Sequence, residues 1–148
     1  MTVTDYLIEP VGKDWSRLLA YWTPPLPANF RLWMVNRLGE IIGTDETGAV
    51  LRLEVGTAKL VQVAGRREDF ARLVDERANA ELWLRISLTD ACRIAGMKLA
   101  ADECYGFRIP PPLLGKYEVS NLVPVKLDSH YSWLAHINRQ DEIYWAGD

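Results

Sequence analysis

Turn-forming residues recur at short, regular intervals between Arg31 and Val63, and this regularity limits the possible folds more than any other feature of the chain. The turns separate four strand-like runs, at 31–35, 40–44, 49–55 and 59–63. In the third run apolar and charged residues alternate, with Leu51, Leu53 and Val55 on one face and Arg52 and Glu54 on the other. Strands joined by short turns pair in antiparallel fashion. The stretch therefore predicts a four-stranded antiparallel meander.

Helical patterns precede and follow the predicted sheet. A short helix is predicted from Asp14, which can cap it, to Trp22, because prolines at positions 24, 25 and 27 end the pattern. After the sheet, apolar residues recur at helical spacing over 68–78 and again over 81–95. The second of these patterns is apolar on more than one face, which predicts a buried helix.

The segment from 102 to 127 contains prolines and short strand-like runs. Residues 102–107 are predicted as a turn or short strand, and Ile109–Pro112 as an extended, rigid turn, because proline fixes φ. Strand-like runs follow at 117–119 and 122–127. A last helix is predicted from His130 to about Gln140, with Ser129 as its cap.

Together these patterns predict an α+β fold. Its four-stranded antiparallel meander is followed by two helices, a short Pro-containing strand region and a C-terminal helix. No internal repeat or long linker interrupts the sequence, and 148 residues is an ordinary length for one domain. Residues 1–148 are therefore predicted to form a single domain.

Composition and charge exclude several classes of protein. The net charge is -3 and basic residues are interleaved with acidic ones, which argues against direct binding of nucleic acid. No apolar run approaches the ~20 residues that span a bilayer, and the first residues do not resemble a signal peptide, so we expect a cytoplasmic protein without a membrane partner. Glycine-rich phosphate-binding motifs are absent, and no cofactor is expected. The sequence does not indicate whether the chain forms homo-oligomers.

The residues most suited to chemistry are two cysteines and two histidines. His130 and His136 are six residues apart, which places them on different sides of a helix, and neither Cys92 nor Cys104 has a CxxC partner, so no metal site is expected. Cys104, His130 and Asp128 could form the site of a cysteine enzyme. A buried cysteine beside a structural histidine explains the same residues, and we favour this interpretation and expect no enzyme activity.

Candidates for binding a partner are acidic pairs at predicted turns, Asp45-Glu46 and Asp102-Glu103. Such pairs are either simply solvated or face basic residues of a partner protein. The six tryptophans form a second group, because those that stay exposed are candidates for an interface; they are Trp15, Trp22, Trp33, Trp83, Trp133 and Trp145.

A distinctive run begins at Asp102 and continues through the Pro-containing region into the last helix. Its marked positions are Cys104, Tyr105, Gly106, Phe107, Pro110, Gly115, Asn121, His130 and Ser132. This run resembles the C-terminal domain of a bacterial family that includes immunity proteins for type VI secretion DNase toxins. Less specific similarity extends the resemblance over 32–140.

The resemblance implies a non-catalytic protein, without cofactors, that occludes a cognate secreted toxin such as a nuclease. The marked positions are interpreted as structural, and we expect Gly106 and Gly115 to adopt conformations that a side chain would strain. Contact with the toxin is expected from Asp45, Glu46, Asp102 and Glu103. The alternative is a small-molecule-binding or regulatory domain without a toxin partner, which a closed apolar pocket would favour.

Overall fold

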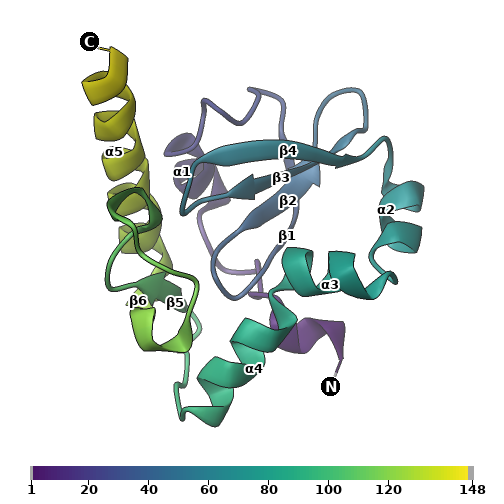
Figure 1. Cartoon of the computed structure of the whole chain (residues 1–148). Coiled ribbons are helices and arrows are strands. Elements are labelled where there is room, and N and C mark those ends of the chain that lie inside the picture. The colour runs from purple at the N-terminus through teal and green to yellow at the C-terminus, as the bar shows by residue number, and fades with distance from the viewer. Residues whose placement is uncertain (1, 147–148) are drawn as a thin grey trace.

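The predicted meander is present in the structure, a computed structural model that describes residues 2–146 and the side chains of residues 2–139. Its strands lie in the order β1-β2-β3-β4 (Figure 1), with bounds Arg31–Val35, Ile41–Thr44, Val50–Glu54 and Lys59–Ala64. All three pairings are antiparallel, and a register shift between Leu32 and Met34 marks a bulge at Trp33 in β1. The α+β class predicted from the sequence is confirmed.

Two helical segments precede the sheet, and three helices come directly after it. The 3-10 helix η1 (Val3–Tyr6) and helix α1 (Trp15–Ala20) come first, and Asp14 caps α1 by accepting a hydrogen bond from the backbone of Arg17. After β4 come α2 (Arg67–Leu73), α3 (Arg77–Leu84) and α4 (Ile86–Ile94).

The prediction of only two helices over 68–95 was wrong. Arg85 adopts a left-handed conformation, with φ 49°, and separates α3 from α4. The expectation of a buried helix also fails for α4, because its buried residues are only Thr89 and Cys92, and Ile94 is 87% exposed. Arg85 is turned toward the buried carboxylate of Glu40, just before β2, a tertiary contact that helical periodicity does not reveal.

A second antiparallel sheet pairs β5 (Glu103–Phe107) with β6 (Leu122–Lys126). The loop between them contains 3-10 helices η2 (Pro111–Leu113) and η3 (Val119–Asn121) in place of the extended and strand-like runs predicted at 109–112 and 117–119. The loop folds back on itself because Asn121 hydrogen-bonds both the N–H and the C=O of Ile109, each at 2.9 Å. Those bonds satisfy backbone groups that a strand would otherwise pair.

Helix α5 spans Leu127–Ala146 and begins directly after β6, so Ser129 lies inside the helix and does not cap it. Figure 1 shows α5 running beside β5 and β6 and past one side of the meander, with α2 and α3 on the opposite side. No helix among the described residues is long and apolar enough to cross a membrane.

Both faces of the meander are covered. One hydrophobic cluster joins Leu53 of the sheet to Trp22, in the turn after α1, and to Phe107 of β5 and Leu134 of α5. A second cluster packs Ile42 and Val50 of the other face against α2 and α3; its aromatic members are Phe70 and Trp83. Because the second face is also buried, Arg52 is only 5% exposed, although the alternating pattern placed it on the polar side of its strand.

Candidate functional site

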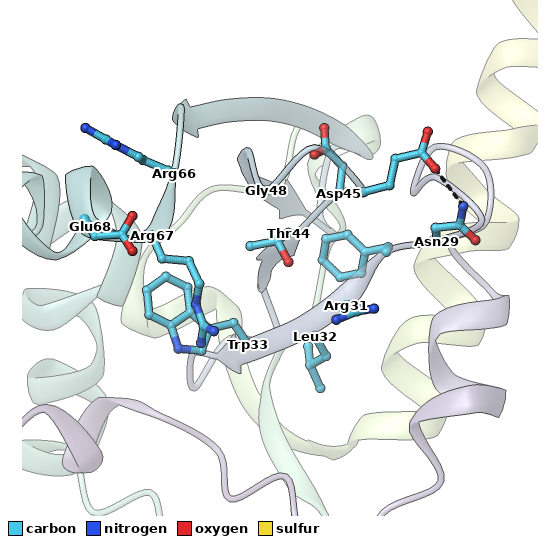
Figure 2. Close-up of a pocket in the computed structure, with 12 residues that line it drawn as sticks. Asn29, Arg31, Leu32, Trp33, Thr44, Asp45, Gly48, Arg66, Arg67 and Glu68 are labelled. Carbon is cyan, nitrogen blue, oxygen red and sulfur yellow. Dashed lines mark hydrogen bonds between the residues drawn. The ribbon is translucent and has the colours of Figure 1, made fainter.

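A hollow of about 800 Å³ opens on the second face of the meander, beside α2 (Figure 2). Antiparallel pairing brings the start of β1, the end of β2 and the end of β4 to one edge of the sheet, where the hollow forms. Arg31 is paired with Thr44 across the strands, so their side chains share this face. The lining residues are Asn29, Phe30, Arg31, Leu32, Trp33, Thr44, Asp45, Glu46, Gly48, Arg66, Arg67 and Glu68. Most of them are charged or polar, unlike the apolar pocket of a small-molecule site.

The acidic pair Asp45-Glu46 lies at the rim of this hollow. The Asp45 carboxylate holds its own turn together, accepting hydrogen bonds from the N–H and hydroxyl of Thr47 and from the N–H of Ala49, at 2.9, 2.6 and 3.1 Å. The hydrogen bond from the Thr47 hydroxyl is the main reason that the pKa of Asp45 is lowered. Glu46 is exposed and accepts one hydrogen bond, from the Asn29 amide at 3.0 Å.

Basic residues in the hollow equal the acidic ones in number. The basic residues are Arg31, Arg66 and Arg67, and the acidic residues are Asp45, Glu46 and Glu68. The Arg67 guanidinium lies 4.4 Å from the centre of the Trp33 ring, a cation–π contact, and Figure 2 shows the arginine crossing that ring while Arg66 extends away from it. The surface of the hollow therefore carries both positive and negative side chains and is not a uniformly acidic patch.

The second acidic pair lies elsewhere, beside the start of β5. Asp102 forms an exposed ion pair with Lys126 at 2.8 Å, and the hydrogen bond from that lysine lowers the pKa of Asp102. Glu103 accepts a hydrogen bond from the backbone N–H of Ala100 at 2.8 Å. Asp102 lines a different hollow, of about 540 Å³, with Lys13, Asp14, Arg17, Lys126 and Asp128. The structure does not bring the two acidic pairs into one site.

Most of the distinctive sequence run is buried. Cys104, Tyr105, Gly106 and Phe107 are buried in β5, and Pro110 and His130 are buried as well. Gly115 and Asn121 are half-buried, whereas Ser132 is exposed.

Gly106 and Gly115 are constrained by close packing and not by φ, so the expectation about their conformations was wrong. A Cβ atom at Gly115 would overlap the carbonyl of Ile109. At Gly106 a Cβ atom would overlap the side chain of Val125 and lie 3.0 Å from His130 Nδ1. Both positions exclude larger residues because a neighbouring group already occupies the space.

The same run attaches β5 and α5 to the turn between β1 and β2. Three successive carbonyl oxygens of that turn, from Arg37 to Gly39, accept hydrogen bonds from Tyr105 N at 2.8 Å, His130 Nε2 at 3.0 Å and Tyr131 Oη at 2.6 Å. Sequence reasoning missed this attachment because nothing in a turn sequence indicates which distant donors its carbonyl groups meet.

A buried ionic cluster, centred on Glu40, lies between the sheet and the α3–α4 junction. Glu40 is 1% exposed and its carboxylate accepts hydrogen bonds from Asn36 at 2.8 Å, Arg52 at 2.6 Å and Arg85 at 2.9 and 3.0 Å. Burial opposes the charge on Glu40, but the hydrogen bonds and positive charges outweigh it and lower its pKa. The cluster is structural, since its polar groups are turned toward one another.

Cys104, His130 and Asp128 do not form the arrangement of a cysteine nucleophile. Burial raises the pKa of the Cys104 thiol, which keeps it protonated. Asp128 binds Tyr21 at 2.7 Å and Arg17 at 2.6 Å, so its carboxylate does not orient His130. In the part of the chain that the structure describes, no three His, Cys, Asp or Glu residues are grouped as metal ligands.

The family model for "T6SS immunity protein Tdi1, C-terminal" matches residues 64–138, about half of the chain. The chain belongs to this family. The resemblance read from the sequence is confirmed, and the Tdi1 C-terminal match contains α2 to α4, both strands of the second sheet and most of α5. No curated protein matches the chain.

The hollow of Figure 2 lies where the part matched by the Tdi1 C-terminal model meets the preceding sheet. Arg66, Arg67 and Glu68 fall inside the match, while Arg31, Trp33 and the acidic pair Asp45-Glu46 precede it. Sequence reasoning identified the acids but missed the Trp33–Arg67 stack, whose partners are far apart in the chain. The high number of tryptophans was the sequence signal that could have pointed to Trp33. It did not single out Trp33, because among tryptophans with described side chains Trp133 is the most exposed, at 38%.

Proposed function

We propose that this chain is an immunity protein of a type VI secretion system that binds its cognate toxin in the cytoplasm. It acts by occlusion, without a catalytic step, and the toxin it neutralises is a nuclease. The observation that carries the proposal is the match of residues 64–138 to the Tdi1 C-terminal family. The protonated, buried thiol of Cys104 is consistent with a role that requires no nucleophile.

Among the four acidic residues expected to contact the toxin, Glu46 is the best placed. The Asp45 carboxylate already accepts hydrogen bonds from backbone groups of its own turn, and Asp102 is paired with Lys126. Glu46 is exposed, and the side chain that hydrogen-bonds to it, Asn29, is uncharged. A nuclease holds phosphates with lysines and arginines, so an exposed carboxylate of this kind has basic groups to meet in its substrate-binding surface.

The test is protection of a bacterial host against a nuclease toxin of a type VI secretion system, with any toxin encoded beside this gene as the first candidate. Expression of the toxin alone should stop growth, and coexpression of this chain should restore it. The purified proteins should form a complex of fixed stoichiometry, and toxin activity should fall in proportion to the immunity protein added. Loss of toxin activity at strongly substoichiometric amounts would instead indicate catalysis and would contradict the proposal.

A further inference from the structure

Two arginines in the hollow of Figure 2 have no acidic partner among the described residues. The hydrogen bonds and ion pairs around the hollow join Asp45 to its turn, Glu46 to Asn29, and Arg66 to Asp69 at 3.4 Å. Arg31 and Arg67 take part in none of them. The hollow thus contains two guanidinium groups that no carboxylate of the described residues neutralises, while of its acids Asp45 is bound within its turn and Glu68, like the two arginines, takes part in none of these contacts.

The positions of these two arginines follow from the bulge in β1. Because the register shifts between Leu32 and Met34, both Trp33 and Met34 turn toward the second face of the sheet and pack against its cluster. Arg31, opposite Thr44, lies on that same face and is exposed. The sheet therefore presents Arg31 and the Trp33 ring together at the floor of the hollow (Figure 2).

Arg67 is held in place by its stack on Trp33, 4.4 Å from the ring centre. Stacking occupies one face of the guanidinium and leaves the N–H groups at its edge free to bind a planar acceptor. A guanidinium that is already positioned loses less side-chain entropy when it binds a carboxylate. The rim supplies negative charge from Glu46 and Glu68, so the hollow suits an isolated carboxylate with basic neighbours better than a continuous polyanion.

We propose that the hollow formed by Arg31, Trp33 and Arg67 receives an acidic side chain, Asp or Glu, of the toxin. The inference rests on the proposed function and names the chemistry of its contact. Arg67 binds the carboxylate through the free edge of its guanidinium, Arg31 supplies the second positive charge, and the rim acids face basic residues on either side of it. A nucleic-acid strand is the competing occupant, because guanidinium groups also bind phosphates.

The first experiment compares toxin affinity across charge reversals. Arg67→Glu and Arg31→Glu should each weaken binding about tenfold or more, because a paired charge at an interface becomes a repulsion. Arg67→Lys keeps the charge but loses the planar guanidinium group. Its affinity for the toxin should lie between that of Arg67→Glu and that of the unchanged protein. The matched control is Arg77→Glu, the same charge change at an exposed position of α3. Equal affinities for the Arg67, Arg31 and Arg77 variants would overturn the inference while leaving the proposed function intact.

A second experiment does not depend on the toxin. A peptide of alternating Glu and Gly should shift the NMR signal of the Trp33 indole N–H, and the matching Gln–Gly peptide should not. Arg67→Glu should abolish the shift. If neither peptide shifts the signal, or if an oligonucleotide duplex binds and loses binding in Arg31→Glu, the assignment to an acidic side chain is wrong. If the toxin does not bind the unchanged protein, the proposed function fails and the peptide result decides the chemistry of the hollow.

Discussion

Glu40 remains charged although it is 1% exposed, because Asn36, Arg52 and Arg85 all donate to its carboxylate. The pKa of Glu40 is lower in the folded protein than in the unfolded chain, where a Glu side chain has a pKa of about 4.3. The contribution of Glu40 to stability is therefore present above that pH and is lost as the pH falls through the folded pKa. Removing the carboxylate would leave Glu54, at 3.9 Å from Arg52 and 3.5 Å from Arg85, as the remaining acidic partner of the two guanidinium groups.

At the residue scale, Phe107 is expected to be a large contributor to stability. It is 4% exposed and its ring contacts Tyr117 and His130, at centroid distances of 5.2 and 6.0 Å. Phe107→Ala should lower the free energy of unfolding by about 3–5 kcal/mol, because a cavity replaces a buried ring. Denaturant unfolding measures the change. The control is Ile109→Ala, two residues after the end of β5, where the side chain is 53% exposed and its loss should change stability far less. Similar losses from the two variants would contradict this assignment.

His130 predicts a pH dependence of stability. Burial lowers the pKa of His130 from 6.5 to about 4, although the hydrogen bond with Leu38 acts in the opposite direction. Between these values the unfolded chain binds a proton that the folded protein does not, so stability is fully present above about pH 6.5 and falls toward pH 4. The loss is on the order of 3 kcal/mol, to be measured by urea unfolding across this range.

The matched control for this pH effect uses the other histidine. His130→Gln should flatten stability between pH 6.5 and pH 4, whatever its effect at neutral pH. His136 is exposed, and His136→Gln should leave the pH dependence of the original protein in place. A slope that persists in the His130 variant would assign the effect to other groups.

At the element scale, Arg85 determines where α3 ends and α4 begins. Its φ of 49° is left-handed, a conformation costly for a residue with a side chain, and its guanidinium binds Glu40 through two nitrogens at 2.9 and 3.0 Å. The ionic contact offsets the backbone strain. A helix boundary is thus specified by a carboxylate forty-five positions earlier in the chain.

Two substitutions at Arg85 separate these effects. Arg85→Ala and Arg85→Gly both remove the hydrogen bonds to Glu40, but only glycine adopts the left-handed conformation without strain. We expect Arg85→Gly to be more stable than Arg85→Ala by about 1 kcal/mol, with both less stable than the original protein. Urea unfolding of the three proteins tests this order. An alanine variant as stable as the glycine variant would mean that the backbone at this position relaxes.

At the scale of the whole molecule, the surface is a mosaic of charges and not a field of one sign. The net charge is only -3, and each hollow that contains a predicted acid also contains basic residues. Association with a toxin should therefore depend on local charge complementarity, with an on-rate that falls as salt rises.

The charge reversal Glu46→Lys should slow association with the toxin and weaken its dependence on salt, if Glu46 faces basic residues there. Glu46 is the suitable position because Asp45→Lys would also destroy the turn that the carboxylate holds. Glu118→Lys, at another exposed position, is the control for the change in net charge. Stopped-flow association rates at several salt concentrations provide the measurement. Equal rates for the two variants would show that steering does not operate at Glu46.

Much of the architecture could be predicted from the chain alone. The spacing of turns and the alternation around Leu51 and Leu53 give the four strands of the meander, and the run from Cys104 to Asn121 indicates the family. These predictions succeed because strand periodicity, turn chemistry and helix caps depend on residues close together in sequence. The end of α1 near a proline cluster is local in the same way.

The tertiary structure alone decided which distant groups meet. It placed Arg85 against Glu40, folded the loop around Asn121, packed β5 and α5 on the carbonyl groups of the β1–β2 turn, and brought Arg67 over Trp33. Each contact joins side chains or backbone groups whose partners a local pattern does not specify. The sequence thus determined the strands of the meander and the family, whereas the helix boundaries, the burial of charge and the composition of the hollow depended on how the elements pack together.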